Sequence, residues 1–231
     1  PRASRPRVAR APSSPSRRRV ATSSPRRHSS TMGSALGRIS EEQPRYDVAR
    51  ACDGYEVRTY EACCVIETTY DPRERDEQGK SFMRLAKYIG VLSKPRNARD
   101  EKIAMTAPVF MTPDATAATR YVMQFVLPKS KFPEGAAQAP RALDPEVAVK
   151  DVPARTMAAR RFSGRMRKEE IEAQTEALKK ALKAAGVQLA HGEKTVVQYA
   201  GYNPPWTPGI MRTNEVLVEI LWDPSADQAA A

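Results

Sequence analysis

Apolar and polar residues alternate along this chain with the periods of strands and helices. Residues 54–70 are rich in β-branched and aromatic types and predict a strand. Residues 78–91 place an apolar side chain at every third or fourth position, which predicts a helix that ends at Gly90. Residues 103–111 and 120–127 alternate apolar and polar positions and predict two strands with one buried face. The buried positions predicted in these two strands are Ile103, Met105, Ala107, Val109 and Met111, then Tyr121, Met123, Phe125 and Leu127.

The same order of elements returns after a connector rich in Pro and Ala at residues 128–145. Residues 167–185 carry a helical stripe of Ile171, Leu178, Leu182 and Ala185, and Gly186 follows as a stop signal. Strands are predicted at residues 146–162, 194–200 and 213–222. The loop at residues 202–209 holds three prolines, which exclude regular structure and stiffen it.

Three fragments of the first half match fragments of the second half at nearly one spacing. Residues 57–62 match residues 154–159, and residues 106–108 match residues 203–205. Between them, Lys87, Gly90 and Val91 match Lys183, Gly186 and Val187. This pattern indicates an internal duplication with repeat halves at about 54–128 and 146–222. We therefore expect an α+β fold in which two strand–helix–strand–strand units form one curved sheet or barrel flanked by two helices.

Charge divides the chain into two parts. Residues 1–40 contain ten Arg, ten Ser and five Pro but no Asp or Glu, whereas the remainder carries 28 Lys+Arg against 27 Asp+Glu. We expect residues 1–43 to be a disordered basic segment, because so few apolar residues cannot offset the cost of ordering the backbone. Its composition is typical of an organelle transit peptide, with a plain disordered tail or a nucleic-acid-binding arm as alternatives.

This division predicts one folded domain at residues 44–224 and a short tail at residues 225–231. The Ser, Pro and Ala content favours a plastid as the destination after removal of the N-terminal segment, with the cytoplasm as the alternative. Because the folded part is almost neutral, we expect no nucleic-acid partner. We expect a monomer. No apolar run approaches the roughly 18 to 20 residues that a membrane span requires.

Few residues offer metal or nucleophile chemistry. The three cysteines, Cys52, Cys63 and Cys64, make a poor disulfide framework and fit a reducing compartment. The two histidines, His28 and His191, cannot complete a zinc site of about four ligands. Cys63 and Cys64 are neighbours in a predicted strand and therefore point to opposite faces, which argues against a thiol enzyme. No phosphate-binding or dinucleotide-binding glycine motif occurs.

Several motifs in order resemble the SOUL haem-binding protein family, nearest its plant and algal branch. The resemblance spans about residues 46 to 223. The motifs are Tyr55-Glu56-Val57-Arg58, Lys102-Ile103-Ala104-Met105-Thr106-Ala107-Pro108-Val109, Gly201-Tyr202-Asn203-Pro204-Pro205-Trp206 and Arg212-Thr213-Asn214-Glu215-Val216.

The resemblance implies a distorted antiparallel β-barrel with two flanking helices and reversible binding of haem or a related porphyrin. It places an apolar cleft beside the first helix and the loop between the last two strands. The aligned site residues are Phe82, Leu85, Ile89, Lys102, Met105, Tyr202, Trp206 and Arg212. The chain departs from the animal branch at Thr207, where that branch has a Lys thought to meet a propionate, and it has no evident counterpart of an axial His.

Haem is a flat apolar disc with two carboxylates at one edge, so a site needs an apolar slot and cations at its rim. Lys102 and Arg212 suit the rim, although each could equally be a solvated surface charge. The apolar candidates could equally be core. Met105, Tyr202 or no protein group would be the axial ligand. A tetrapyrrole carrier or buffer without catalysis is the leading hypothesis. An enzyme acting on a tetrapyrrole, or a module for another small molecule or protein, remains open.

Overall fold

The structure is a computed structural model that describes residues 39–223 except residues 92, 118 and 205. The predicted basic segment up to residue 38 and the predicted tail at residues 225–231 lie outside the described residues. Two helices, α1 (Glu77–Ile89) and α2 (Lys168–Ala184), accompany three short 3₁₀ turns, η1 (Gly135–Ala137), η2 (Gly192–Lys194) and η3 (Gly209–Met211). The strands are β1 (Tyr46–Cys52), β2 (Tyr55–Tyr60), β3 (Cys63–Tyr70), β4 (Val109–Pro113), β5 (Tyr121–Val126), β6 (Ala148–Val152), β7 (Arg155–Phe162), β8 (Gln188–Leu189), β9 (Val197–Gly201) and β10 (Asn214–Leu221).

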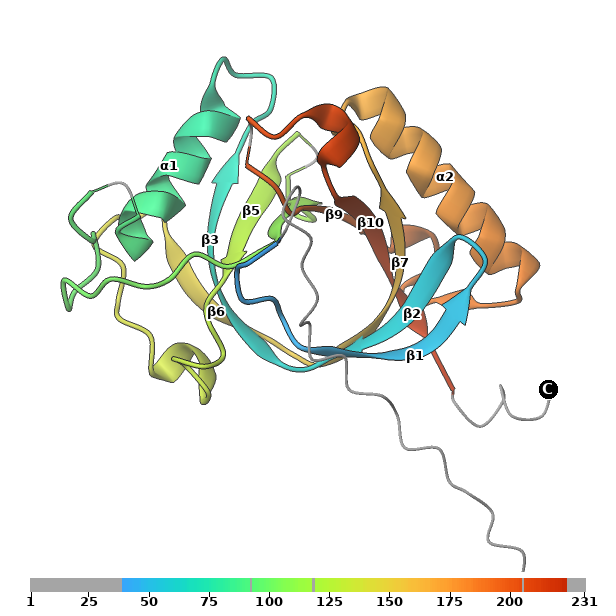
Figure 1. Ribbon diagram of the computed structural model, residues 1–231, viewed down its shortest axis with the longest axis horizontal. Coiled ribbons are helices and arrows are strands. Elements are labelled where there is room, and N and C mark those ends of the chain that lie inside the picture. The colour runs from blue at the N-terminus through green and yellow to red at the C-terminus, as the bar shows by residue number, and fades with distance from the viewer. Residues whose placement is uncertain (1–38, 92, 118, 205, 224–231) are drawn as a thin grey trace, which may run out of the picture.

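The strands form one antiparallel sheet in the order β1-β2-β7-β10-β9-β4-β5-β3-β6, and β8 adds to β10. This sheet is strongly curved, and Figure 1 shows its strands arranged in an arc. Among the described residues no ladder joins the edge strands β1 and β6, so the sheet is open. The α+β class with an antiparallel sheet and two helices is confirmed, whereas the predicted barrel is not, because β1 and β6 do not pair.

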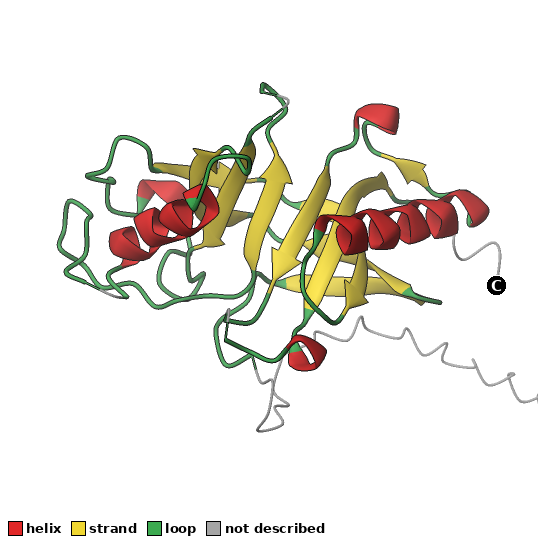
Figure 2. Ribbon diagram, turned by 90° about the horizontal axis from the view of Figure 1, so that it is seen from above, coloured by secondary structure: helices red, strands yellow, loops and turns green. Residues whose placement is uncertain are grey.

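Both helices lie on the outer side of the curved sheet (Figures 1 and 2). Helix α1 packs on β3 and β5, and α2 packs on β7 and β10. The centre of the sheet, where β4 pairs with β9, therefore lies between the two helices in the strand order. None of the helices in the described part of the chain has the length and apolarity that a membrane span requires.

The predicted helices form within one or two residues of the expected bounds. Each buries the apolar stripe that its periodicity indicated, with Leu85 and Ile89 in α1 and Leu178 and Leu182 in α2. Gly90 ends α1 with φ of 76°, and its N–H donates to the carbonyls of two residues in the last turn. Ala185, the last member of the second predicted stripe, is exposed because it follows the end of α2.

Three strand predictions need correction. Residues 146–162 form two strands, β6 and β7, separated by Pro153 and Ala154. Residues 54–70 form two strands, β2 and β3, separated by Glu61 and Ala62. In residues 103–111 only β4 is a strand, because its partner β9 ends at Gly201, which lies opposite Val109. The preceding residues instead follow the end of α1, where the Ile103 N–H donates to the Ile89 carbonyl at 3.0 Å. The strand β1 was not predicted.

Of the three pairs of matching fragments, only one occupies equivalent places in the two halves of the fold. Gly90 and Gly186 both follow the end of a helix and both have positive φ. In contrast, residues 57–62 end β2 whereas residues 154–159 begin β7, and these two strands pair with each other. Residues 106–108 precede β4, but residues 203–205 follow β9. The duplication itself stays a prediction.

The core consists of three clusters, two on the outer side of the curved sheet and one on its inner side. The first, under α1, is built on Ile66, Leu85, Ile89, Met123 and Phe125. The second fills the inner side of the curve around Phe110, Val126, Met157 and Leu217. The third lies under α2 around Val57, Leu178, Leu182, Val216 and Val218.

Candidate functional site

The structure brings four of the predicted site residues together under α1. Leu85 and Ile89 are buried in the first core cluster, with exposed fractions of 0% and 2%. Phe82 and Met105 pack against the same cluster and remain half-buried. A ligand beside α1 would therefore touch Phe82 and Met105, whereas Leu85 and Ile89 are covered by protein in this structure.

The other four predicted residues do not belong to the first core cluster. Trp206 is 83% exposed on the loop between β9 and β10. Tyr202 is buried at the start of that loop, and Arg212 donates from Nε to the Thr207 carbonyl at 2.8 Å. Lys102 is exposed ahead of β4.

Six half-buried apolar side chains pack on the first core cluster from α1, β4, β5, β9 and the adjoining loops. We call them the central apolar surface: Phe82, Met105, Val109, Tyr121, Met166 and Tyr199. Two of its rings lie side by side, with 6.3 Å between the Tyr121 and Tyr199 centroids, and the buried Tyr70 ring lies 5.8 Å from Tyr121 beneath them. Such rings offer flat faces to a planar apolar molecule.

Two local contacts shape this surface. Gly201 on β9 has no side chain, and a Cβ there would lie 2.9 Å from the Met166 Cε atom. The glycine therefore lets Met166 lie directly on the strand. On the other side, Gln78 of α1 donates from Nε2 to the Met111 sulfur at 3.3 Å and ties the helix to β4.

Sequence reasoning did not select Tyr121, Met166 or Tyr199 for a site. Alternation within 120–127 could place Tyr121 on the core face, but Met166 lies outside any predicted element and Tyr199 in a strand with no other signal. Burial raises the pKa of Tyr199 to about 12, with a further increase from the neighbouring Tyr121. Burial likewise raises the pKa of Tyr70. These hydroxyls therefore remain protonated near neutral pH and are poor iron ligands.

A buried ionic cluster on the inner side of the sheet was also missed. The guanidinium of Arg58 on β2 donates two hydrogen bonds of 2.9 Å to the carboxylate of Glu215 on β10. Tyr202 donates to the same carboxylate at 2.7 Å, and Arg161 donates to it at 3.2 Å. The plane of Arg58 also lies over the Tyr46 ring, 4.6 Å from its centroid. Both ends of the β9–β10 loop, Tyr202 and Glu215, thus meet in this cluster.

The charges in the cluster stabilise one another. Burial alone raises the pKa of Glu215, but hydrogen bonds from Arg58 and its positive charge lower this pKa more strongly, so the carboxyl is ionised. Burial lowers the pKa of Arg58, and Glu215 more than reverses this effect. For Tyr202, burial and the charge of Glu215 raise the pKa, so its hydroxyl remains a donor.

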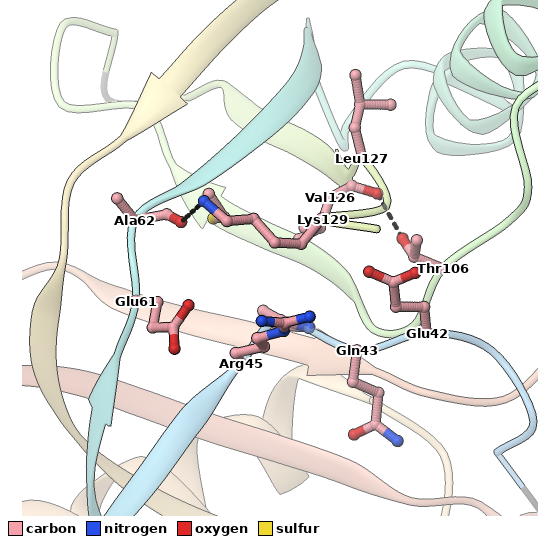
Figure 3. A pocket seen from close by; sticks show the side chains of 11 residues that line it. Glu42, Gln43, Arg45, Glu61, Ala62, Thr106, Val126, Leu127 and Lys129 are labelled. Carbon is pink, nitrogen blue, oxygen red and sulfur yellow. Dashed lines mark hydrogen bonds between the residues drawn. The ribbon is translucent and has the colours of Figure 1, made fainter. Parts of the chain in front are cut away.

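One small cavity lies where the N-terminal residues cross the inner side of the sheet (Figure 3). Its volume of about 10 Å³ holds about one water molecule, far too little for a porphyrin. The dashed bonds in Figure 3 run from Lys129 to the Ala62 carbonyl and from Thr106 to the Val126 carbonyl. Other bonds hold the N-terminal residues here, because the Ala107 N–H donates to the Glu42 carbonyl and the Glu61 N–H donates to the Arg45 carbonyl, both at 3.0 Å.

Metal-binding and nucleophilic groups are sparse in the described part of the chain. There, no three His, Cys, Asp or Glu side chains gather as a metal site would require. Cys64 packs in the first core cluster and Cys63 against the second, which confirms that they face opposite sides of β3. Burial raises the pKa of both thiols, that of Cys64 to about 12, which opposes formation of a thiolate. His191 is exposed beside Glu219.

Comparison with known proteins decides the family. Residues 41–219 match the family described as SOUL heme-binding protein. The chain belongs to the SOUL heme-binding protein family. No curated protein matches the sequence of this SOUL protein.

Solved structures share the fold of this SOUL protein at low sequence identity. The EcmrR C-terminal domain matches with a TM-score of 0.50 and 11% identity, over 73% of this chain and 98% of that chain. An uncharacterized conserved protein from Listeria innocua matches with a TM-score of 0.50 and 10% identity, over 72% of this chain and 92% of that chain. These likenesses show the fold alone.

The residues of this SOUL protein fit the haem that its family binds. The central apolar surface offers partly exposed aromatic and thioether groups from several elements. Methionine side chains adapt to the shape of a guest, and tyrosine rings can stack on it. Haem would supply its own ring and metal chemistry, while the chain supplies apolar contact and charge.

Proposed function

We propose that this chain binds haem or a related tetrapyrrole reversibly on the central apolar surface, with the β9–β10 loop beside it. The observation that carries the proposal is the set of six half-buried apolar side chains over the middle of the sheet. These side chains leave apolar surface in contact with water. A flat apolar ligand that covers them would remove this surface from water, which favours binding.

The β9–β10 loop can supply the charge that the propionates of a tetrapyrrole need. The resemblance places a Lys of the animal branch where this chain has Thr207. Here the Arg212 guanidinium lies against the Thr207 carbonyl, so a cation occupies the same part of the loop. A guanidinium suits a carboxylate because it is planar and permanently charged. Arg212 would therefore orient the propionate edge of the ligand.

The role that follows is carriage or buffering rather than catalysis. Burial raises the pKa of Tyr199 in the central apolar surface and that of the buried Tyr202, which disfavours a phenolate ligand to iron. Met105 and Met166 offer at most a thioether. Binding would then depend mainly on burial of the ring, which suits reversible release.

A hemin titration of the full chain tests this proposal. We expect a shift of the Soret band at micromolar hemin, with affinity reduced about tenfold by Phe82→Ala or Tyr199→Ser, because each loses apolar contact with the ring. Leu143→Ala, at an exposed apolar residue elsewhere, is the matched control. An unshifted Soret band, or equal affinity in all four proteins, would show that the central apolar surface is not the site.

We also propose that the basic N-terminal segment directs the chain to a plastid and is then removed. The support is its composition of Arg, Ser and Pro without acidic residues. Import of the full chain into isolated chloroplasts should yield a shorter product that begins near residue 44. Uptake without shortening, or no uptake, would contradict this proposal.

A further inference from the structure

Two large apolar side chains project from the β9–β10 loop. Trp206 is 83% exposed and Ile210 is 88% exposed, more than any other large apolar residue in the described part of the chain. They lie four positions apart, and each is separated from the core clusters. Isolated exposed apolar residues are common, but two such residues on one loop indicate a surface that is covered at some stage.

Hydrogen bonds fix the β9–β10 loop in the conformation that exposes Trp206 and Ile210. The Gly164 N–H donates to the Gly209 carbonyl at 2.9 Å, and the Asn214 side chain donates to the Gly164 carbonyl at 2.9 Å. Arg212 and Thr213 bond within the loop to Thr207 and Asn203. These bonds join the β9–β10 loop to the turn between β7 and α2, and Figure 1 shows η3 of this loop beside the start of α2.

The turn against which the loop packs is basic. Arg165, Arg167 and Lys168 are all exposed there, and a Cβ at Gly209 would lie 3.9 Å from the Arg165 Cγ atom. Residues 152–168 and 194–214 contain no Asp or Glu. Arg165 and Arg167 form no ion pair with any described residue, so their charge is available to a partner.

We propose that the β9–β10 loop docks on an anionic lipid bilayer, with Trp206 and Ile210 at headgroup depth and Arg165 and Arg167 against the lipid phosphates. Tryptophan is suited to that depth because its ring is apolar and its N–H is polar. Apolar contact and attraction to anionic lipid act together in surface binding, and each cation near the surface contributes. A protein partner is favoured less, because two separated side chains supply little of the area that a stable interface buries.

This proposal goes beyond haem binding and does not depend on it. The bilayer partner would bring the chain to a membrane surface, where apolar tetrapyrroles can be exchanged without crossing water. The acidic residues nearest in sequence to the basic turn are Glu169 and Glu170 of α2, and the one nearest to the loop, Glu215, is buried. We therefore expect the β9–β10 loop to face the lipid and the side of α2 to face away from it.

Vesicle binding by the full chain tests the proposal. The chain has two tryptophans, so a Trp222→Phe background makes Trp206 the reporter. With vesicles of phosphatidylcholine and about a third phosphatidylglycerol, Trp206 emission should shift to the blue and be quenched by brominated lipid. In vesicle sedimentation, the double variant W206A/I210A should partition onto the lipid about tenfold more weakly than its parent. The double variant R165A/R167A should partition about 30-fold more weakly.

Matched controls separate the loop from the basic N-terminal segment, which all variants share. Leu143→Ala removes another exposed apolar side chain, and K179A/K180A removes two cations from α2. Both controls should bind vesicles like the parent. Equal binding by all variants, or unquenched Trp206, would overturn the proposal and assign vesicle binding to the N-terminal segment. Weaker hemin binding with unchanged vesicle binding in W206A/I210A would overturn it too and leave the loop as part of the ligand site.

Discussion

Arg58 and Glu215 lie 157 positions apart in the chain and form a bidentate salt bridge with two N–O distances of 2.9 Å. Both are almost completely inaccessible to solvent, at 1% and 0%. The pair links β2 to β10 across β7, which lies between them in the sheet. Because Tyr202 also donates to Glu215, the pair sets where the β9–β10 loop leaves the sheet and returns to it.

Removing the charge of Glu215 should destabilise the fold strongly. Glu215→Gln leaves the buried guanidinium of Arg58 without its counterion, and we expect the free energy of unfolding to fall by about 3 kcal/mol. Urea denaturation measures this loss. Glu219→Gln on the same strand is the control, because its side chain is 39% exposed and its loss should be small. Equal stability of the two variants would contradict the prediction.

The contribution of Glu215 should depend on pH. Its pKa in the folded chain is lowered from the ordinary value of 4.5, because the bonds and charge of Arg58 outweigh the effect of burial. A carboxyl of this kind stabilises the fold above its ordinary pKa and loses that effect as the pH falls through the lowered pKa. The stability difference between the parent and Glu215→Gln should therefore be full near pH 6 and shrink below about pH 4.5. A difference that stays constant down to pH 3 would argue against this origin.

The hydroxyl of Tyr202 should contribute more than an ordinary buried hydroxyl. Tyr202→Phe removes a 2.7 Å bond to an ionised carboxylate, which we expect to cost about 2 kcal/mol. Tyr88→Phe provides the comparison, since the Tyr88 hydroxyl donates at 2.6 Å to the neutral carbonyl of Pro140 and should cost about 1 kcal/mol. Thermal unfolding of both variants measures the order. The reverse order would show that the charge of Glu215 does not strengthen the bond.

The two helix-ending glycines should differ in their tolerance of alanine. Gly90 and Gly186 have φ of 76° and 68°, so Ala costs about 1 kcal/mol of strain at either position. At Gly90 an added Cβ would also lie 2.5 Å from the Pro95 Cγ atom, whereas at Gly186 nothing lies within 4 Å. We expect Gly90→Ala to be the more destabilising variant in urea denaturation. Equal losses would show that the Pro95 ring moves aside at no cost.

Gly201→Ala should separate ligand binding from stability. Its Cβ would meet the end of the flexible Met166 side chain, which can move, so the free energy of unfolding should change by less than about 1 kcal/mol. The displaced Met166 would alter the central apolar surface, and hemin affinity should change several-fold in the Soret titration. An unchanged affinity would place Met166 outside the ligand contact. Gly79→Ala, with nothing within 4 Å of the added Cβ, is the control.

The strands show where local pattern stops being informative. Periodicity located β5 and β10 closely, because their alternation reflects one buried face. It extended β4 too far toward its start, since alternation continues to Ile103 although the pairing partner ends at Gly201. The strand β1 was missed because most of its side chains are exposed or half-buried at the edge of the sheet. The length of a strand therefore depends on its neighbour.

The sequence pattern was also insufficient to define the candidate ligand site. The sequence indicated that Phe82, Leu85 and Ile89 share a helical face, but burial by β3 and β5 decided that two of them are covered. Tyr121 and Tyr199 are neighbours only because β4 lies between β5 and β9. Nothing near either residue in the sequence signals this contact.

By itself, the sequence determined the two helices, the mixed class, the basic N-terminal composition and, through ordered motifs, the family. Each of these depends on residue types at short and regular spacings. Only the tertiary structure decided that the sheet stays open, that Arg58 meets Glu215 and that Trp206 projects from the loop. The physical reason is that pairing, burial and exposure belong to contacts between distant residues, and a side chain carries no local mark of the partner it will meet.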